Sequence, residues 1–546
     1  MKSFKCIAGF LFLSIFTSLF NANAESPHFY YEWIVSLSYR APLGVNKQVI
    51  VINDQFPGPL LNTTTNDVVD INIYNNMTVP FLMTWNGVQL RRTSWQDGVE
   101  GTNCPIPPGK NWTYSFQVKD QIGSFFYYPS LLLQKSAGGY GAIRINNPFD
   151  VPIPFPQPFE DFDLLIGDWY NADYQDLRTS LDNGEILPSP DGILINGLPP
   201  YQAVLDFEPG VTYRLRISNV GLRTSLNFRI YDHMLLLVET EGSYTVKQYL
   251  DSLDIHVGQS YSVLVTAKNV SGESYYMVAS SRFTDFELFG IGIIRYPDSA
   301  GVPDGPLPVG PFFRDYQFSV DQARSIRWDL SVGAARPNPQ GSYHYGSINV
   351  TRTLVLENGV MFNGNKKAFT INGVSFLQPD TPLKLADYFQ ISDVFSPGVI
   401  PDIPNSNYPP VFGTSVIYAN QRDFYHIVFQ NPAEFLQSWH LDGYNFFVVG
   451  MDAGMWDESK IATYNMIDAV SRSTVQVYPF SWTSILVMLD NRGMWNLRSQ
   501  DAVNSYLGQQ LYIRVEGPEK DPSEISARDE SPIPQNALLC GKAVYP

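Results

Sequence analysis

The same order of motifs occurs three times along this chain, and no other feature of the sequence restricts the fold as much. Each occurrence opens with Ile-Asn followed by Asp or Gly, at Ile52-Asn53-Asp54, Ile195-Asn196-Gly197 and Ile371-Asn372-Gly373. Each continues with an alternating segment that ends in asparagine, at 71–75, 215–219 and 427–431. Such alternation, rich in Val, Ile, Tyr and Phe, predicts half-buried strands of antiparallel sheets. The repeat is far longer than the roughly 20–50 residues of a solenoid unit, so it predicts a whole β-sandwich present three times.

Two stretches rich in proline and glycine separate the three units. Residues 147–158 and 297–311 cannot supply a regular strand ladder or continue a helix, so they are predicted to be linkers. They divide the chain into domains at 25–146, 159–296 and 312–546, the last with a C-terminal tail. A chain of this length is too long for one hydrophobic core, which agrees with several domains.

The first 24 residues have the form of a secretory signal. Lys2 and Lys5 precede an apolar run from Cys6 to Phe20, and Ala22-Asn23-Ala24 follows as a small-x-small cleavage site. No later segment has the 18 or so consecutive apolar residues of a membrane span, and 536–546 is too short and polar for a GPI signal. We therefore expect an exported protein, extracellular and without a membrane anchor.

Cysteines and glycosylation motifs agree with that compartment. Without Cys6, only Cys104 and Cys540 remain, and an even pair in an oxidising compartment predicts one disulfide, here between the first domain and the C-terminal tail. Five N-x-Ser/Thr motifs predict surface positions that can carry N-glycans. They are Asn62, Asn76, Asn111, Asn269 and Asn349.

The charge balance excludes one class of partner. The chain has 53 acidic and 36 basic side chains, a formal net charge of −17. This makes nucleic acid an improbable ligand and argues against bulk adhesion to acidic polysaccharide or anionic membranes, although a local basic patch could bind either. The charge does not identify the extracellular or cell-wall ligand.

Several spaced motifs carry a family resemblance. Phe56-Pro57-Gly58-Pro59, Gly123 to Tyr127, Gly138-Gly139-Tyr140-Gly141 and Trp439 to Gly443 resemble framework segments of the multicopper oxidases, in the order found in plant ascorbate oxidase and laccase. The match runs from about Tyr30 to about Val515. It implies an all-β fold of three consecutive cupredoxin-like Greek-key β-sandwich domains.

In that family, ten histidines and one cysteine bind a blue copper and a trinuclear cluster, because imidazole and thiolate suit copper. This chain has six histidines in total, which excludes the complete set. The resemblance places His440 at the sole retained ligand position. The other ten ligand positions are replaced by Thr84, Asn86, Tyr128, Ser130, Gln437, Asp442, Arg498, Ser499, Gln500 and Asn504, and Gln509 stands where the axial ligand of the blue copper would lie.

The residues at these positions predict how the space that copper would occupy is filled in this chain. Ser499 stands where the cysteine would lie and cannot supply a soft thiolate. Asp442 and Arg498 occupy former ligand positions of one cluster, so we predict that they face each other as a charge pair. An unpaired arginine there would cost several kcal/mol, and its charge would repel copper ions. We expect no copper cofactor and assign no catalytic or cofactor-binding residue.

Other chemistry receives less support from the sequence. His233, which follows Asp232, and the strand-like His256 and His426 are interpreted as structural, because no activated nucleophile accompanies them. His28 and His344 have no recognisable partner. A glycosidase pair among the carboxylates has no identifying spacing. Most aromatic residues are interpreted as core, with Trp85, Trp95, Trp439 and Trp495 as candidate stacking platforms.

Two functions follow from the resemblance. The favoured one is a secreted, non-catalytic glycoprotein of the cell wall or apoplast, like the plant monocopper-oxidase-like proteins and pollen-type ascorbate-oxidase homologues. Its implied role is in cell expansion or pollen tube tip growth. The alternative is a copper-dependent, ascorbate-oxidase-like oxidoreductase that retains a single copper at His440.

Overall fold

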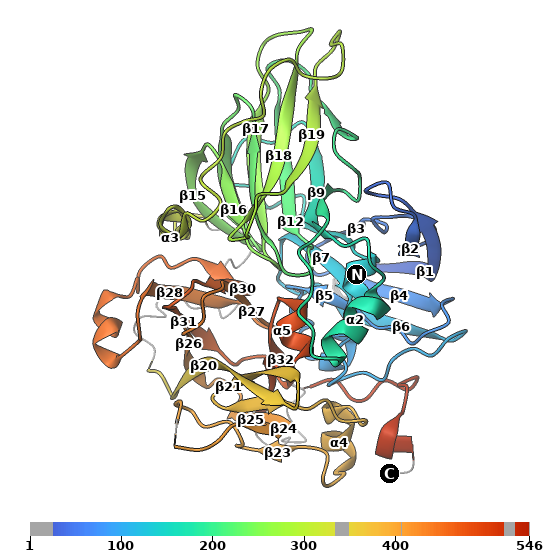
Figure 1. The fold of residues 1–546 in the computed structure, drawn as a ribbon, viewed down its shortest axis with the longest axis vertical. Helices are drawn as coiled ribbons and strands as arrows, with labels where there is room; N and C mark the ends of the chain where they lie inside the picture. The colour runs from blue at the N-terminus through green and yellow to red at the C-terminus, as the bar shows by residue number, and fades with distance from the viewer. Residues whose placement is uncertain (1–25, 333–348, 406, 518–529, 545–546) are drawn as a thin grey trace, which may run out of the picture.

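The computed structural model describes residues 26–332, 349–405, 407–517 and 530–544. The signal predicted at 1–24 and His344 lie outside the described residues. Within the described ranges the chain forms six sheets, two in each third of the sequence, and the three units occupy the corners of a triangle (Figure 1). This arrangement confirms the prediction of an all-β protein built from three β-sandwiches.

In each unit two sheets pack face to face, and the hydrophobic core between them is continuous with the cores of the other units. The first sheet of the first unit contains, in spatial order, β2 (Lys47–Ile52), β1 (His28–Arg40), β4 (Val68–Asn75) and β6 (Asn111–Gln117). The second contains β3 (Leu61–Thr64), β8 (Gly141–Asn146), β7 (Gly123–Pro129) and β5 (Met83–Asn86).

The second unit is the tall sandwich at the top of Figure 1. One of its sheets contains β10 (Gly192–Ile195), β9 (Asp161–Trp169), β12 (Thr212–Asn219), β17 (Ser260–Thr266), β14 (Leu235–Thr240) and β15 (Ser243–Leu250). The facing sheet contains β11 (Ala203–Asp206), β19 (Phe289–Arg295), β18 (Ser274–Arg282), β13 (Ser225–Ile230) and β16 (Leu253–Ile255).

The third unit has the largest sheets. One contains β24 (Val411–Gly413), β22 (Val374–Phe376), β21 (Lys366–Ile371), β20 (Arg352–Asn363), β26 (Phe424–Asn431), β31 (Ser481–Met488), β28 (Phe446–Ala453) and β29 (Ser471–Arg472). The other contains β23 (Ser396–Pro397), β25 (Ser415–Asn420), β33 (Gln510–Glu516), β32 (Gly493–Ser499), β27 (Gln437–Leu441) and β30 (Thr474–Val477).

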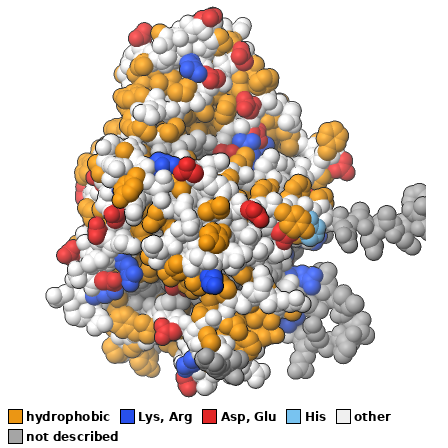
Figure 2. All heavy atoms as spheres, turned by 90° about the vertical axis from the view of Figure 1, so that its right-hand side faces the viewer, with side chains coloured by type: hydrophobic (Ala, Val, Ile, Leu, Met, Phe, Trp, Pro, Cys, Tyr) orange, Lys and Arg blue, Asp and Glu red, His pale blue; other side chains and the backbone are white. Residues whose placement is uncertain are grey.

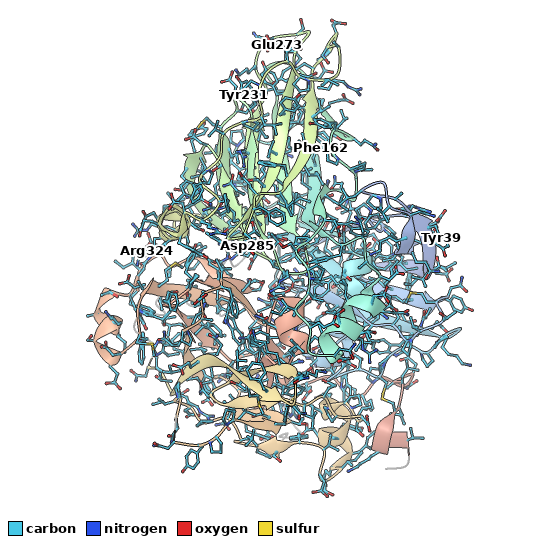
Figure 3. All side chains as sticks on the ribbon, in the orientation of Figure 1. Tyr39, Phe162, Tyr231, Glu273, Asp285 and Arg324 are labelled. Atoms are coloured by element: carbon cyan, nitrogen blue, oxygen red, sulfur yellow. A yellow bond between two sulfur atoms is a disulfide. The ribbon has the colours of Figure 1, made fainter. Side chains whose placement is uncertain are left out.

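The helices are short and lie outside the sandwiches (Figure 1). The α-helices are α2 (Tyr174–Asp182), α3 (Tyr316–Ser325), α4 (Leu383–Phe389) and α5 (Ala502–Tyr506), and the 3₁₀ turns are η1 (Ser94–Gln96), η2 (Gln134–Ala137), η4 (Glu458–Thr463) and η5 (Gly541–Val544). Arg324, labelled in Figure 3, lies on α3 where the second and third units meet, and donates to Met451 O at 2.6 Å. No helix within the described residues is long and apolar enough to span a membrane.

The repeated Ile-Asn motif forms the same turn in all three units. Asn53, Asn196 and Asn372 adopt φ values of 51°, 51° and 48°, in the left-handed region that asparagine tolerates. Each side-chain oxygen accepts a backbone N–H of a neighbouring strand, at 2.8, 2.7 and 2.7 Å respectively. The repeat therefore marks a turn in which a side chain replaces part of the backbone ladder.

The asparagines that end the three alternating segments also have one shared role. Asn75, Asn219 and Asn431 are fully buried at the ends of β4, β12 and β26. Each accepts the backbone N–H two residues ahead, at 3.0 Å in all three, and donates its amide to carbonyls of the following loop. Buried polar groups of this kind are stable only when fully hydrogen-bonded, so they fix the loop geometry.

The predicted strands exist, but two features of the prediction were wrong. The sheets are mixed, because β1 pairs with β4, β9 with β12 and β20 with β26 in parallel. The segments 215–219 and 427–431 are buried on both faces. Arg216 illustrates the reason: it donates to Asp161 at 2.9 Å and to Ser124 of the first unit at 2.8 Å. The polar side chain of Arg216 thus contacts another unit and does not face solvent.

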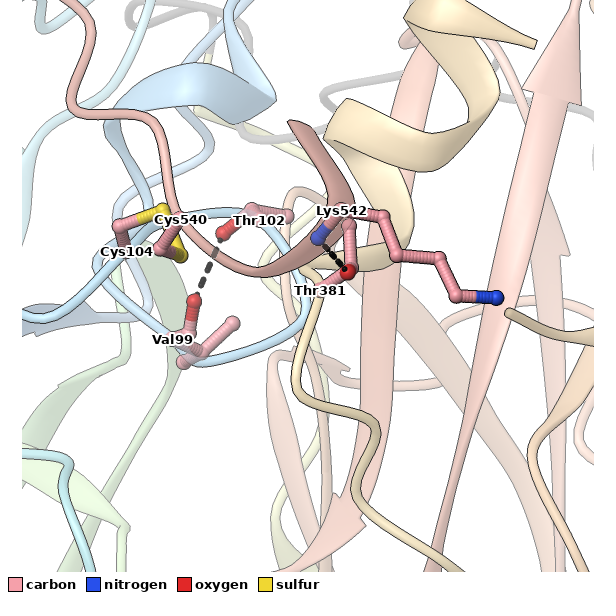
Figure 4. Close-up of a disulfide and its surroundings, with 6 residues drawn as sticks. All are labelled: Val99, Thr102, Cys104, Thr381, Cys540 and Lys542. Carbon is pink, nitrogen blue, oxygen red and sulfur yellow. Dashed lines mark hydrogen bonds between the residues drawn. A yellow bond between two sulfur atoms is a disulfide. The ribbon is translucent and has the colours of Figure 1, made fainter. Parts of the chain in front are cut away.

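The first unit and the C-terminal tail are joined covalently. Cys104 and Cys540 form a disulfide across 436 residues of sequence (Figure 4). Beside it, Lys542 N donates to Thr381 Oγ1 at 2.8 Å, which holds the tail against the third unit as well. The pairing agrees with the cysteine count of the sequence.

The surface has a mixed character. Apolar, acidic and basic side chains are interspersed over the face shown in Figure 2. All five asparagines of the glycosylation motifs, Asn62, Asn76, Asn111, Asn269 and Asn349, are exposed, which confirms their predicted surface positions.

Candidate functional site

Two pairs of strands bring the former ligand positions together. In the first unit β5 runs antiparallel to β7, with Thr84 opposite Tyr128. In the third unit β27 runs antiparallel to β32, with His440 opposite Arg498. The two pairs meet across the junction of the units, where Gln500 Nε2 donates to Asn86 Oδ1 at 2.7 Å. The candidate site is therefore shared between the first and third units.

A buried network of charged residues lies at the centre of this junction. Arg498 donates one guanidinium nitrogen to Asp442 Oδ2 and the other to Tyr128 Oη at 3.1 Å. His440 Nε2 lies 3.0 Å from the second oxygen of Asp442, and its Nδ1 is hydrogen-bonded to Thr474 Oγ1 at 2.8 Å. The contact confirms the predicted charge pair of Asp442 and Arg498. Asp442 also contacts the one retained imidazole, so His440 faces a carboxylate and not an open ligand position.

Electrostatics favours this network in its ionised form. Burial opposes ionisation of Asp442, but the Arg498 guanidinium and His440 outweigh it and lower the pKa of the carboxyl. Burial lowers the pKa of His440, so its imidazole is neutral at neutral pH. Burial, followed by the charge of Asp442, raises the pKa of the nearby Asp97 well above its ordinary value. The network thus contains one full ion pair beside a neutral imidazole, and ionisation of the neighbouring Asp97 carboxyl is disfavoured.

The positions that would surround a blue copper are occupied by amides and a hydroxyl. Gln437, Ser499, Asn504 and Gln509 are each at most 1% exposed. Several of their polar atoms have no hydrogen-bond partner among the described residues: Gln437 Nε2, Ser499 Oγ, Asn504 Nδ2 and both side-chain amide atoms of Gln509. These neutral groups occupy the ligand positions that the resemblance implies, and they do not form a complete hydrogen-bond network among the described residues.

The residues at the implied cluster position and at the implied blue-copper position do not fit copper. Copper sites of the family that the motifs resemble need convergent imidazoles and a thiolate, whereas this junction offers one imidazole, one carboxylate that is paired with Arg498, amides, hydroxyls and a guanidinium. No group of three or more His, Cys, Asp or Glu side chains that could hold a metal ion occurs in the described part of the chain. The Arg498 charge further disfavours a cation at the cluster position.

The remaining described histidines have protein partners. His233 Nε2 lies 2.9 Å from Tyr296 Oη, His256 Nδ1 lies 2.9 Å from Ser225 Oγ, and His426 Nε2 lies 2.8 Å from Ser484 Oγ. These bonds agree with their interpretation as structural residues. His28, on the surface, lies 3.2 Å from Asp70, a partner that the sequence did not reveal.

The four candidate stacking tryptophans are part of the interior. Trp85, Trp95, Trp439 and Trp495 are at most 3% exposed. Trp439 stacks on Phe429 with ring centroids 5.1 Å apart, and Trp85 packs edge-on against Tyr114 at 5.3 Å. They contribute to the core and present no ring face to a ligand.

Buried histidines predict a loss of stability in acid. Burial lowers the pKa of His426 to about 4, whereas the unfolded chain titrates near 6.5. The folded pKa lies below the unfolded one, so the contribution is complete above about pH 6.5 and is lost as the pH falls towards 4. We expect His426→Gln to remove about 1.4 kcal/mol per pH unit from the slope of unfolding free energy between pH 6 and 4.5.

Urea unfolding at a series of pH values measures that slope. His28→Gln is measured alongside, because it removes an exposed imidazole instead of a buried one. Equal slopes for His426→Gln and the wild type would contradict the assignment of His426 as a buried neutral imidazole.

The charged residue Lys135 lies at this junction and belongs to none of the ligand motifs in the sequence. Lys135, on η2, is only 4% exposed, and its Nζ lies 4.3 Å from the ring centroid of Tyr128. A signal was present, because this lysine stands in a largely apolar segment after Leu131-Leu132-Leu133. A cation in such a segment indicates a buried or functional position.

Comparisons with known proteins agree with this geometry. Three profiles described as multicopper oxidase match residues 35–150, 160–298 and 380–521. An L-ascorbate oxidase homolog of Brassica napus is 48% identical over 99% of this chain and 97% of its own length. The monocopper oxidase-like protein SKU5 of Arabidopsis thaliana is also 48% identical, over 97% of this chain and 92% of its own.

A solved structure supports the fold. Fet3p, a multicopper oxidase that functions in iron import, superposes with a TM-score of 0.75 at 22% identity, over 89% of this chain and 90% of that one. Each of the three units is thus cupredoxin-like, as the motifs implied.

Proposed function

Since this chain belongs to the multicopper oxidase family, in the branch of plant L-ascorbate oxidase homologues and monocopper oxidase-like proteins, we propose that it is a secreted glycoprotein of the cell wall or apoplast without oxidase activity. On this proposal the protein keeps the fold of the oxidases and uses it to bind an extracellular partner. A role in cell expansion or tip growth would follow from such binding.

The observation that supports this proposal most is the ion pair at the centre of the junction. Arg498 and Asp442 fill positions that resemble copper ligands, and Tyr128 completes the hydrogen bonds of the guanidinium. An oxidase of this family needs a thiolate to pass electrons between its copper centres, and Ser499 is at that position. Electron transfer by the family route therefore has no donor set in this chain.

Copper content tests the proposal directly. We expect the glycosylated protein, collected from the medium of expressing plant cells and dialysed first against copper and then against buffer, to hold less than about 0.1 copper per chain, because its donors do not suit the ion. Mass spectrometry measures the metal and the visible spectrum reports a blue centre. Recovery from the medium tests secretion in the same preparation.

A second variant separates the proposal from its alternative. One tightly bound copper that disappears in His440→Gln, together with oxygen consumption in the presence of ascorbate, would replace the proposal by a single-copper oxidase. Copper that persists in His440→Gln would lie elsewhere on the surface and would leave the junction assigned as copper-free.

A further inference from the structure

A cavity opens at the junction, beside the ion pair. Its volume is about 190 Å³, and its lining comes from both the first and the third unit. Buried Lys135, Arg498 and Ser499 form one part of the wall, and the rings of Tyr128 and Tyr512 form another. Partly exposed residues, among them Tyr506, line the side nearer to solvent. The cavity thus combines buried hydrogen-bond donors with aromatic walls.

Lys135 is a buried amine that contacts no carboxylate among the described residues. Its Nζ has no hydrogen-bond partner among the described residues, and its closest aromatic contact is the ring of Tyr128. The two carboxylates that act on it from a distance are Asp168 and Asp501. Both are engaged elsewhere: Asp168 accepts from Thr224 Oγ1 at 2.7 Å, and Asp501 accepts from Val503 N at 3.0 Å. Burial lowers the pKa of Lys135 to about 7, so its ammonium form is only partly populated near neutral pH, and an anion beside it would stabilise that form.

The groups around Lys135 add hydrogen-bond donors to the cavity but little net charge. Arg498 is matched by Asp442, and its second guanidinium nitrogen donates to Tyr128. Ser499 Oγ is buried and has no partner within the described residues. The acidic residue of the lining is Glu100, and burial raises its pKa to about 7, which reduces its charge near neutral pH. Near neutral pH Lys135 and Glu100 are therefore both only partly ionised, and an anion that enters the cavity meets an amine that can take up a proton and a free hydroxyl.

We propose that this cavity binds a small organic carboxylate, with Lys135 as its counter-ion and Ser499 as a further hydrogen-bond donor. A single positive charge suits a monoanion better than a phosphate dianion, and the tyrosine rings suit an organic body no larger than one sugar ring. The inference rests on the proposed function, because the same space would otherwise be shared with copper. It adds the class of ligand that the copper-free site recognises.

Calorimetric titration of the secreted, glycosylated protein tests the proposal. The probes are acetate, benzoate and glucuronate, compared with uncharged glucose and with inorganic phosphate. We expect at least one carboxylate to bind with a Kd of about 1 mM or below, with glucose and phosphate binding much more weakly. No carboxylate binding, or phosphate binding equal to that of the best carboxylate, would overturn the assignment.

Variants of Lys135 connect the binding to this cavity. Lys135→Met should weaken the carboxylate about tenfold or more, because it removes the charge that pairs with the ligand. Lys542→Met makes the same charge change on the exposed tail, at a distance from this cavity, and should bind as the wild type does. Equal affinities for Lys135→Met and the wild type would also refute the proposal.

Thermal unfolding excludes a trivial explanation by misfolding. Without ligand, Lys135→Met should unfold at a higher temperature than the wild type, because a buried unpaired charge has been removed. Added carboxylate should raise the unfolding temperature of the wild type only. The copper measurement is separate: bound copper would refute the proposed function, whereas absent carboxylate binding in a copper-free protein would refute only this inference.

Discussion

Asp442→Ala is expected to destabilise the protein by about 3–5 kcal/mol, because it leaves the Arg498 guanidinium buried without its counter-charge. Arg498 is only 7% exposed and cannot turn to solvent without opening the junction of two units. Its remaining bonds, to Tyr128 Oη at 3.1 Å and Asn496 Oδ1 at 3.0 Å, involve neutral groups and cannot replace the carboxylate. Urea unfolding at neutral pH measures the loss.

The double variant Asp442→Ala/Arg498→Met separates the two contributions. Removing both charges should recover most of the stability lost in Asp442→Ala, since an apolar replacement of a buried pair is often neutral or stabilising. Asp206→Ala is the control, because Asp206 forms a two-bond pair with Arg295 on the surface, where little effect is expected. Additive losses in the double variant would show that Asp442 and Arg498 are not energetically coupled.

The second large effect is expected from the disulfide. Replacing Cys104 and Cys540 by serine should lower the free energy of unfolding by about 2–5 kcal/mol, because the bond closes a loop that contains most of the chain. The tail would keep weaker contacts, such as Trp95 Nε1 to Ser531 O and Trp112 Nε1 to Asn536 O, each at 3.2 Å. Thermal and urea unfolding of the double-serine variant measure the change.

Limited proteolysis shows where that stability is lost. We expect cleavage of the tail around 530–544 in the variant and in reduced wild type, while the oxidised wild type resists. The reduced wild type is the control for any effect of the serines themselves. Unchanged stability together with a protected tail would mean that the non-covalent contacts suffice to hold it.

The sequence predicted the number and type of units because local physics decides them. A turn that needs an asparagine in the left-handed region, as at Asn196, and a strand that ends in a buried asparagine, as at Asn219, leave short motifs that repeat in each unit. Burial on both faces of β12 was not predictable in this way. Arg216 on this strand donates to Ser124 of the first unit, which lies 92 residues away in sequence.

The site was predicted in part for a similar reason. The contact of Asp442 with Arg498 follows from two former ligand positions that must converge, whatever residues occupy them. The unpaired Lys135 does not belong to any ligand motif, and its lack of a counter-ion is a property of the folded chain alone. Sequence patterns reveal which positions meet, but the balance of charge among them depends on every neighbour in three dimensions.

The paired charges at the junction also limit how this protein could evolve. A histidine in place of Asp442 alone would leave the Arg498 guanidinium buried without a counter-charge. A histidine in place of Arg498 alone would leave the Asp442 carboxylate in the same state. Each single reversal therefore passes through a less stable protein before any metal-binding benefit exists. On the proposed function, ten of the eleven ligand positions would have to be refilled around the one remaining imidazole, so selection could change what this scaffold binds more easily than it could rebuild an oxidase.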